Sequence, residues 1–232
     1  MAKKEKFETR LEIINLALHV FLTQGYTESS TKKIAQGLGI SVGNLAYHFP
    51  TKEHLLAELT ERICKYHVQV MESEIDEGQT SLLAYLMVLT CMMAVCEESE
   101  IAKDLYTSIY RSPLALSIIR NAESEKVREI FREYCPGWEP EDFALTENAI
   151  SGVHYGSLMT EDTLHVSLDK RIVKTLNVVM KAYNVPEEMR ELKIKKVLAL
   201  DYRRIGRRFI TGFAEYVESV NRKALDEAYD KL

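Results

Sequence analysis

The sequence predicts an all-α protein. Apolar residues recur at three- and four-residue spacing along most of the chain, which is the period of a helix buried on one face. Glycine and proline are scarce, at 10 and 5 of 232 residues, so long regular elements with few turns are expected. Alternating β-branched runs between turn residues hardly occur, which argues against strands. We therefore expect an amino-terminal three-helix unit with a helix-turn-helix, followed by a larger helical domain.

The first helix is expected over residues 6–24, after a frayed basic arm at residues 1–5. Gly25 follows the last apolar position, and glycine is the usual residue just past a helix end. The apolar stripe of this helix consists of Phe7, Leu11, Ile14, Leu18 and Phe21.

The stretch from Ser29 to Lys52 predicts two short helices joined at Gly39, because glycine can adopt the left-handed backbone of a sharp turn. Hydroxyl residues precede each helix and can cap it: Ser29, Ser30 and Thr31 before the first, and Ser41 before the second. In the second helix Leu45 and Phe49 lie four residues apart and are expected to face inward. The positions then left facing outward are Val42, Gly43, Asn44, Ala46, Tyr47 and His48.

A fourth helix over residues 51–76 is expected to connect the two parts of the chain. We place the domain boundary near its start, with the helix-turn-helix domain at residues 1–52 and the second domain at 53–232. Breaks are clearest around Gly78, at 135–140 and at Val185-Pro186. The helices expected in the second domain cover about 81–97, 99–111, 113–134, 141–160, 163–183, 187–203 and 204–230.

Composition excludes several classes of protein. The apolar fraction of 46% and the charged fraction of 28% are ordinary for a globular chain. The longest near-apolar run, 82–96, is shorter than the roughly 18–20 residues of a membrane span, so we expect no membrane partner and a cytoplasmic protein. The four cysteines form no CxxC pair, so we expect reduced thiols, no metal and no cofactor. No nucleophile–base, HExxH or phosphate-loop motif indicates an enzyme.

Residues 6–56 resemble the DNA-binding domain of the TetR family of transcriptional regulators, and this resemblance covers about a quarter of the chain. The string from Tyr47 to Phe49, followed by Lys52 and the pair Leu55-Leu56, is its most diagnostic part. The other matching features occur in family order. They are Ala17, Phe21, Gly25-Tyr26, Ser29-Ser30-Thr31, Ile34-Ala35, Gly39-Ile40-Ser41 and Gly43-Asn44-Leu45.

The resemblance implies a role for each matching position in binding double-stranded DNA. Hydroxyls, lysines and helix N-termini suit phosphates, whereas a valine can meet a thymine methyl and an asparagine an adenine edge. Ala46 departs from the family, which usually has a large residue there, so one contact is expected to be missing. The implied phosphate contacts are Ser30, Thr31, Tyr47, His48 and Lys52, and the implied base-edge positions are Lys32, Val42, Gly43 and Asn44.

Simpler roles remain open for some of these residues. Tyr47 can be a half-buried aromatic, and His48 can serve only as a cap for its own helix. Lys33 is expected to be a solvated lysine.

The resemblance also implies that the second domain binds an unknown small-molecule effector and forms a homodimer through the C-terminal helices. The late apolar face over 204–230 is a candidate for covering by a second copy. Methionine and aromatic side chains suit an apolar pocket, although core packing is the simpler role for each. The candidate ligand-binding residues are Tyr85, Met92, Tyr106, Tyr110, His154, Tyr155 and Met159.

These inferences predict a TetR-like repressor that binds a palindromic operator as a homodimer and is released by a ligand. The alternative is a helical ligand-binding or interaction protein whose head no longer binds DNA. Ala46 and the net charge of −5 favour the alternative. The charge is unevenly distributed, however: residues 1–65 carry +2 and the remainder −7, which suits a protein that touches DNA at one end.

Overall fold

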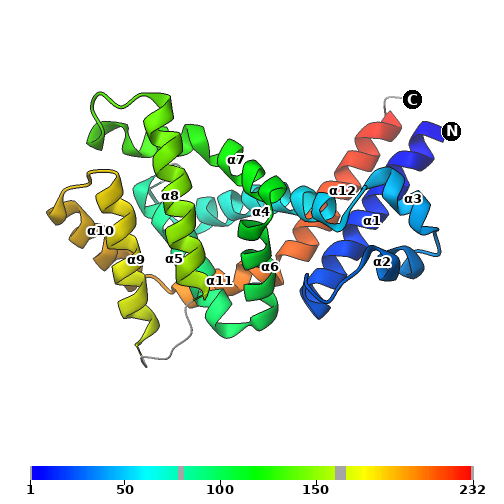
Figure 1. Ribbon diagram of the computed structural model, residues 1–232, viewed down its shortest axis with the longest axis horizontal. Coiled ribbons are helices and arrows are strands. Elements are labelled where there is room, and N and C mark those ends of the chain that lie inside the picture. Colours follow the sequence, from blue (N-terminus) through cyan, green and yellow to red (C-terminus); the bar gives the residue numbers. More distant parts are fainter. Residues whose placement is uncertain (1, 78–80, 160–165, 231–232) are drawn as a thin grey trace.

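The computed structural model describes residues 2–77, 81–159 and 166–230, and every regular element in these ranges is a helix (Figure 1). The all-α prediction is therefore confirmed. The helices are α1 (Ala2–Gln24), α2 (Thr31–Gly37), α3 (Val42–His48), α4 (Lys52–Glu74), α5 (Leu82–Glu98), α6 (Glu100–Arg111), α7 (Pro113–Phe131), the 3-10 turn η1 (Arg132–Tyr134), α8 (Pro140–Met159), α9 (Leu168–Ala182), α10 (Glu187–Ala199), α11 (Tyr202–Thr211) and α12 (Phe213–Asp230).

Helices α1, α2 and α3 form a small head at one end of the molecule (Figure 1). The side chains of Phe21, Ile34 and Leu45, one from each helix, are fully buried in its core. Gly39 has φ 68° at the turn between α2 and α3, the left-handed conformation predicted for it. Gly25 likewise has φ 85° just after α1. Helix α1 begins at Ala2, so residues 2–5 of the arm expected to fray over 1–5 are helical, and residue 1 lies outside the described ranges.

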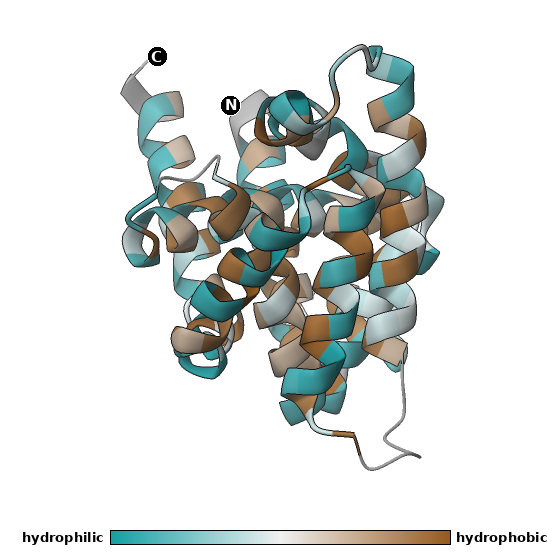
Figure 2. Ribbon diagram, turned by 90° about the vertical axis from the view of Figure 1, so that its left-hand side faces the viewer, coloured by the Kyte–Doolittle hydropathy of each residue, from teal (hydrophilic) through white to brown (hydrophobic). Residues whose placement is uncertain are grey.

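Helix α4 runs from the head into the body, where it packs against α7 and α11 (Figure 1). Helix α5 is the most buried element of the body, as its nearly continuous apolar sequence predicts. Cys91 and Cys96 lie in this buried helix, and burial raises the pKa of both thiols, which is consistent with cysteines that serve as small core residues. Figure 2 shows the hydrophobic segments mainly where helices meet, with hydrophilic segments outward.

The helix predicted over 204–230 is two helices, α11 and α12, which meet at Gly212. A Cβ on Gly212 would lie 2.1 Å from the Tyr66 hydroxyl oxygen, so any larger residue at this junction would displace the Tyr66 side chain of α4. Helix α10 ends at Ala199, four residues earlier than predicted. The described part of the helix predicted over 163–183 begins at Leu168, and residues 160–165 lie outside the described ranges.

Much of the apolar face of α11 and α12 is covered within the chain, although Val220 is 36% exposed. Ile205, Phe209, Phe213 and Val217 are all buried at 1% exposure or less. Helix α12 turns back to pack beside α1, which brings the two ends of the chain together at the head (Figure 1). Periodicity reveals an apolar face but not its partner, and here much of the face packs inside the chain. A homodimer through the C-terminal helices stays a prediction.

Candidate nucleic-acid interface

Helix α3 presents most of its surface to solvent. Its inner side is fixed by Leu45 and Phe49, which are 0% and 2% exposed. The Ser41 hydroxyl accepts a hydrogen bond from the backbone N–H of Asn44 at 3.1 Å, which caps the helix as predicted. Of the residues predicted to face outward, four are exposed, Val42, Gly43, Asn44 and Tyr47, whereas Ala46 and His48 are half-buried.

Helix α2 precedes the Gly39 turn, and its first residues lie near the exposed surface of α3. The Ser30 hydroxyl accepts from the Lys33 N–H at 3.2 Å, so Ser30 is its N-cap. Thr31 is half-buried at the first position of the helix, and Lys32 is exposed. Lys33 is also exposed, and its ammonium donates to the Glu28 carbonyl oxygen at 3.4 Å.

Tyr47 lies against a cation that the sequence did not assign to this surface. The Lys6 ammonium donates to the Tyr47 hydroxyl at 2.6 Å and lies 4.2 Å from the ring centroid. Tyr47 itself is 66% exposed, so the half-buried role left open for it does not apply. Lys6 was missed because it lies at the start of the first predicted helix, 41 residues before Tyr47, and no local pattern relates the two. Together Lys6 and Tyr47 place a positive charge and a phenol at the end of α3.

His48 lies on the inner side of this pair. Its Nδ1 is buried and has no hydrogen-bond partner among the described residues. Desolvation lowers the pKa of His48, and the nearby charges of Lys6 and Arg10 lower it further. The imidazole is therefore neutral at pH 7. The Phe49 backbone N–H, which donates to the Leu45 carbonyl oxygen at 2.8 Å, closes the helix.

Lys52 is directed into the head. Its ammonium donates to three backbone carbonyl oxygens of the α1–α2 loop, those of Tyr26 at 2.9 Å, Thr27 at 3.3 Å and Ser29 at 3.0 Å. It also lies 4.3 Å from the centroid of the Tyr26 ring. Desolvation by burial lowers its pKa. Because an ammonium has three N–H donors, this geometry can use all of them within the protein.

The same loop is attached to the body of the molecule. The Thr27 backbone N–H donates to the Asp104 carboxylate of α6 at 2.8 Å, and the Thr27 hydroxyl donates to its other oxygen. Helix α6 therefore contacts the head close to where α2 begins.

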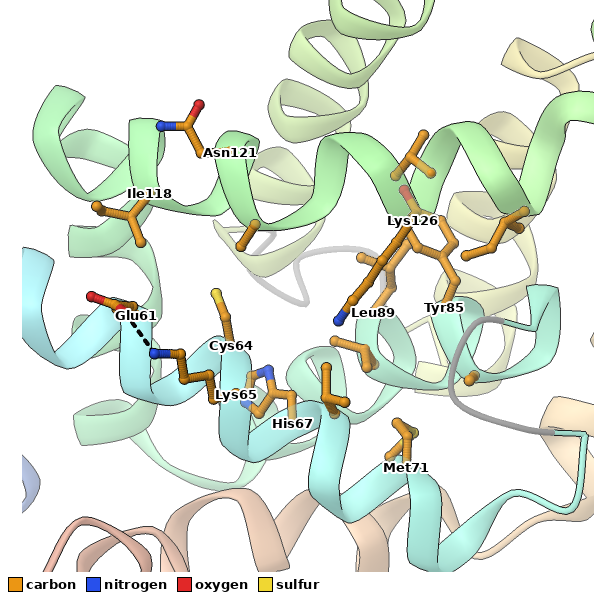
Figure 3. A pocket seen from close by; sticks show the side chains of 16 residues that line it. Glu61, Cys64, Lys65, His67, Met71, Tyr85, Leu89, Ile118, Asn121 and Lys126 are labelled. Atoms are coloured by element: carbon orange, nitrogen blue, oxygen red, sulfur yellow. Dashed lines mark hydrogen bonds and ion pairs between the residues drawn. The ribbon is translucent and has the colours of Figure 1, made fainter. Parts of the chain in front are cut away.

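The body contains a cavity of about 590 Å³ between α4, α5 and α7 (Figure 3). Tyr85, one of the candidate ligand-binding residues, lines it. A smaller adjoining cavity of about 30 Å³ is lined by four more of the predicted residues, Met92, Tyr106, Tyr110 and His154. Tyr155 and Met159 line neither cavity, and Met159 is 42% exposed. The sequence missed the walls from α4 and α7, which include Cys64, His67, Ile118, Lys126 and Ile130.

The buried histidines between these cavities are neutral. The Leu89 carbonyl oxygen can only accept, so His154 donates to it from Nε2 at 3.2 Å and accepts the Tyr110 hydroxyl at Nδ1, at 2.7 Å. Burial lowers the pKa of His154 to about 4. His67 stacks on the ring of Phe209 at 3.9 Å, and burial lowers its pKa to about 3.

Glu147 is the buried acid of the smaller cavity. The Tyr183 hydroxyl donates to its carboxyl group at 2.6 Å, and desolvation raises its pKa. Among the described residues no group of three or more His, Cys, Asp and Glu side chains is placed to hold a metal ion. No helix in the described ranges is long and apolar enough to cross a membrane.

Two solved structures align with most of the chain at low identity. One is the TetR family protein CprB from S. coelicolor A3(2), which aligns with TM-score 0.44 and 16% identity over 88% of this chain and 98% of that chain. The other is a gamma-butyrolactone receptor (ArpA-like protein), which aligns with TM-score 0.43 and 15% identity over 90% of this chain and 98% of that chain. At these TM-scores the likeness supports no statement about how the body works.

The amino-terminal part of the chain has clearer relatives. It is 29% identical over 87 residues to the fatty acid metabolism regulator protein of Bacillus subtilis (strain 168), covering 38% of this chain and 45% of that protein. It is 37% identical over 59 residues to the HTH-type transcriptional regulator AcrR of Shigella flexneri, covering 25% and 27%. The chain therefore spans about half the length or less of these relatives.

Residues 13–59 match the family model described as bacterial regulatory proteins, tetR family. The match contains α2, the Gly39 turn and α3, and it extends into α1 and α4 on either side. The amino-terminal domain of the chain is thus similar to that of the TetR family of bacterial regulatory proteins, and the relatives that it matches include transcriptional regulators.

Proposed function

We propose that this protein is a repressor that binds a palindromic DNA operator as a homodimer and leaves it when a small molecule binds the body. The observation that carries the DNA-binding part is the exposed outer surface of α3, a capped two-turn helix whose opposite side is anchored by Leu45 and Phe49. A short helix held in this way at one end of a molecule can enter the major groove.

The proposed contacts divide by chemistry. Val42, Gly43 and Asn44 open α3 and would lie at base edges, and Lys32 on α2 would lie nearby. Ser30, Thr31, Tyr47 and His48 would contact phosphates, with Lys6 added beside Tyr47. For Lys52 we propose a positioning role, because its ammonium already has three carbonyl partners in the α1–α2 loop.

The homodimer would use α8 and α9. Three large apolar side chains on these helices are exposed, Leu145 at 68%, Val178 at 48% and Met159 at 42%. Gly152 and Gly156 lie one helical turn apart on α8, and no atom of the described residues lies within 4 Å of a Cβ built on either. Small residues at this spacing let a second helix approach closely, and a two-fold symmetric dimer is the commonest oligomer.

Release would work through α4. This helix begins at Lys52, directly after the α3 segment, and forms one wall of the large cavity with Cys64, His67 and Met71. A ligand that binds better to a conformer with a different α4 position would lower DNA affinity by linkage. The two domains would then be the head at 1–52 and the body at 53–232, with α4 as the lever. A chromosomal operator implies a cytoplasmic protein.

The DNA-binding part can be tested with a fluorescent fragment of the DNA upstream of the gene. We expect binding by the full chain, and a large loss of affinity for Asn44→Ala and Tyr47→Ala, measured by anisotropy. Gln69→Ala removes an exposed side chain far along α4 and should bind as the unmodified protein does. Absence of binding at low salt would favour the alternative of a head that no longer recognises DNA.

A further inference from the structure

Lys126 stands apart among the residues that line the large cavity. Figure 3 shows its side chain reaching from α7 into the cavity, toward α4. Within the described part of the chain no carboxylate lies within ion-pair distance of its ammonium. A lysine whose charge is directed into a largely apolar space, and not to a partner, needs an explanation.

The other charged residues at the cavity do not compensate the charge of Lys126. Glu61 and Lys65 pair with each other at 2.6 Å, and both are exposed. His67 is buried, and burial lowers its pKa to about 3, so its imidazole carries no charge to pair with Lys126. Glu147 lies in the adjoining cavity, where burial raises its pKa and so disfavours its negative charge. The Lys126 ammonium is therefore the uncompensated charge among the described lining residues.

The remaining walls suit a hydrocarbon body. They come from three helices, with Val68 and Met71 on α4, Val88 and Leu89 on α5, and Ile118 and Ile130 on α7. A volume of about 590 Å³ is within the range of cavities that enclose small ligands. Burying a second positive charge here would be unfavourable, whereas an anion would pair with the one already present.

We infer that the large cavity binds an amphipathic anion, with its acidic group on the Lys126 ammonium and its apolar body between α4, α5 and α7. This inference rests on the proposed function, since it names the chemical class of the ligand that the body would take. It adds Lys126 as the residue that selects the charge of the ligand.

The test compares three probes with the same hydrocarbon chain, each below its micelle-forming concentration. Calorimetric titration of the full chain at pH 7.5 with decanoate, decan-1-ol and decyltrimethylammonium should show the order decanoate, then decanol, then the ammonium compound. Lys126→Met keeps the length of the side chain and removes its charge. It should weaken decanoate binding about tenfold to a hundredfold, as expected for a hydrogen bond to a charged group, and leave decanol binding unchanged.

Two further variants make the result specific. Lys126→Arg retains the charge and should retain the preference for decanoate. Arg128→Met removes a positive charge from the same helix, at a residue that does not line the cavity, and should bind decanoate as the unmodified protein does. If Lys126→Met does not fold by circular dichroism, the comparison of decanoate with decanol on the unmodified protein still decides the matter. Equal affinity for the two probes, or a preference for the ammonium compound, would overturn the inference.

Measuring DNA anisotropy with the same probes separates this inference from the proposed function. Decanoate binding that depends on Lys126 but leaves DNA affinity unchanged would support the inference and contradict ligand release. Release of DNA by decyltrimethylammonium, with no binding of decanoate, would overturn the inference and leave the proposed function standing.

Discussion

Replacing Lys52 by Met tests whether this lysine holds the head together or contacts DNA. The change removes an ammonium that donates to the carbonyl oxygens of Tyr26, Thr27 and Ser29. A hydrogen bond to a charged group contributes about 1.5–3 kcal/mol, but water can replace the ammonium at a half-exposed site. We therefore expect Lys52→Met to lower the free energy of unfolding by only about 1–2 kcal/mol in total.

The salt dependence of DNA binding distinguishes the two roles. Each phosphate that the protein neutralises contributes about 0.9 to the slope of log affinity against log salt concentration. A lysine that only positions the α1–α2 loop should lower DNA affinity at every salt concentration without changing this slope. Anisotropy titrations over a series of salt concentrations would measure the slope, and urea unfolding would measure stability.

Lys6→Met is the matched comparison, because Lys6 is exposed beside Tyr47. We expect it to reduce the salt slope by about 0.9 for each subunit, with little effect on stability. The reasoning is refuted if Lys52→Met reduces the slope as much as Lys6→Met does while the free energy of unfolding stays the same. That result would mean that the Lys52 ammonium leaves its carbonyl partners for a phosphate.

Three further predictions concern stability. The pKa of His67 is about 3 in the folded protein and near 6.5 when unfolded, so only the unfolded chain gains this proton as pH falls below 6.5. Between pH 7 and pH 5 the free energy of unfolding, measured with urea, should therefore fall by about 2 kcal/mol more in the unmodified protein than in His67→Phe. Equal losses in the two proteins would contradict this. Asn221→Ala removes a buried amide that donates to Asn15 at 2.6 Å, and it should lower the free energy of unfolding by about 1–3 kcal/mol; a neutral result would show that α12 detaches from α1. Gly206→Ala places a Cβ 2.8 Å from the Cys91 carbonyl oxygen, so calorimetry should show a lower Tm, and an unchanged Tm would mean that α11 and α5 separate without cost.

The head was predictable in detail because local rules decide its parts. The four-residue spacing of Leu45 and Phe49 sets the inner side of α3, and Gly39 fits the turn because of its freedom at positive φ. What local rules could not supply was the pairing of Lys6 with Tyr47. Those residues are distant in sequence and meet only when α1 packs against α3.

The body was predictable as a set of helices but not as a set of contacts. The spacing of apolar residues predicted an apolar face on α12. Only the structure reveals that this helix packs against α1, through pairs such as Asn15 and Asn221. The pocket residues were chosen by their aromatic or methionine character, which found Tyr85 and His154. Lys126 escaped that criterion, because a charged residue on a helix ordinarily belongs to its solvated face.

A footprint of the full chain on the DNA upstream of its gene tests the central claim most directly. The account predicts two protected half-sites related by two-fold symmetry, with centres about 34–36 Å apart, one turn of the duplex. The same footprint should be lost with Asn44→Ala, because Asn44 lies exposed at the start of α3. Protection that is unsymmetrical, or that persists unchanged with Asn44→Ala, would contradict the claim that two copies of α3 read the DNA.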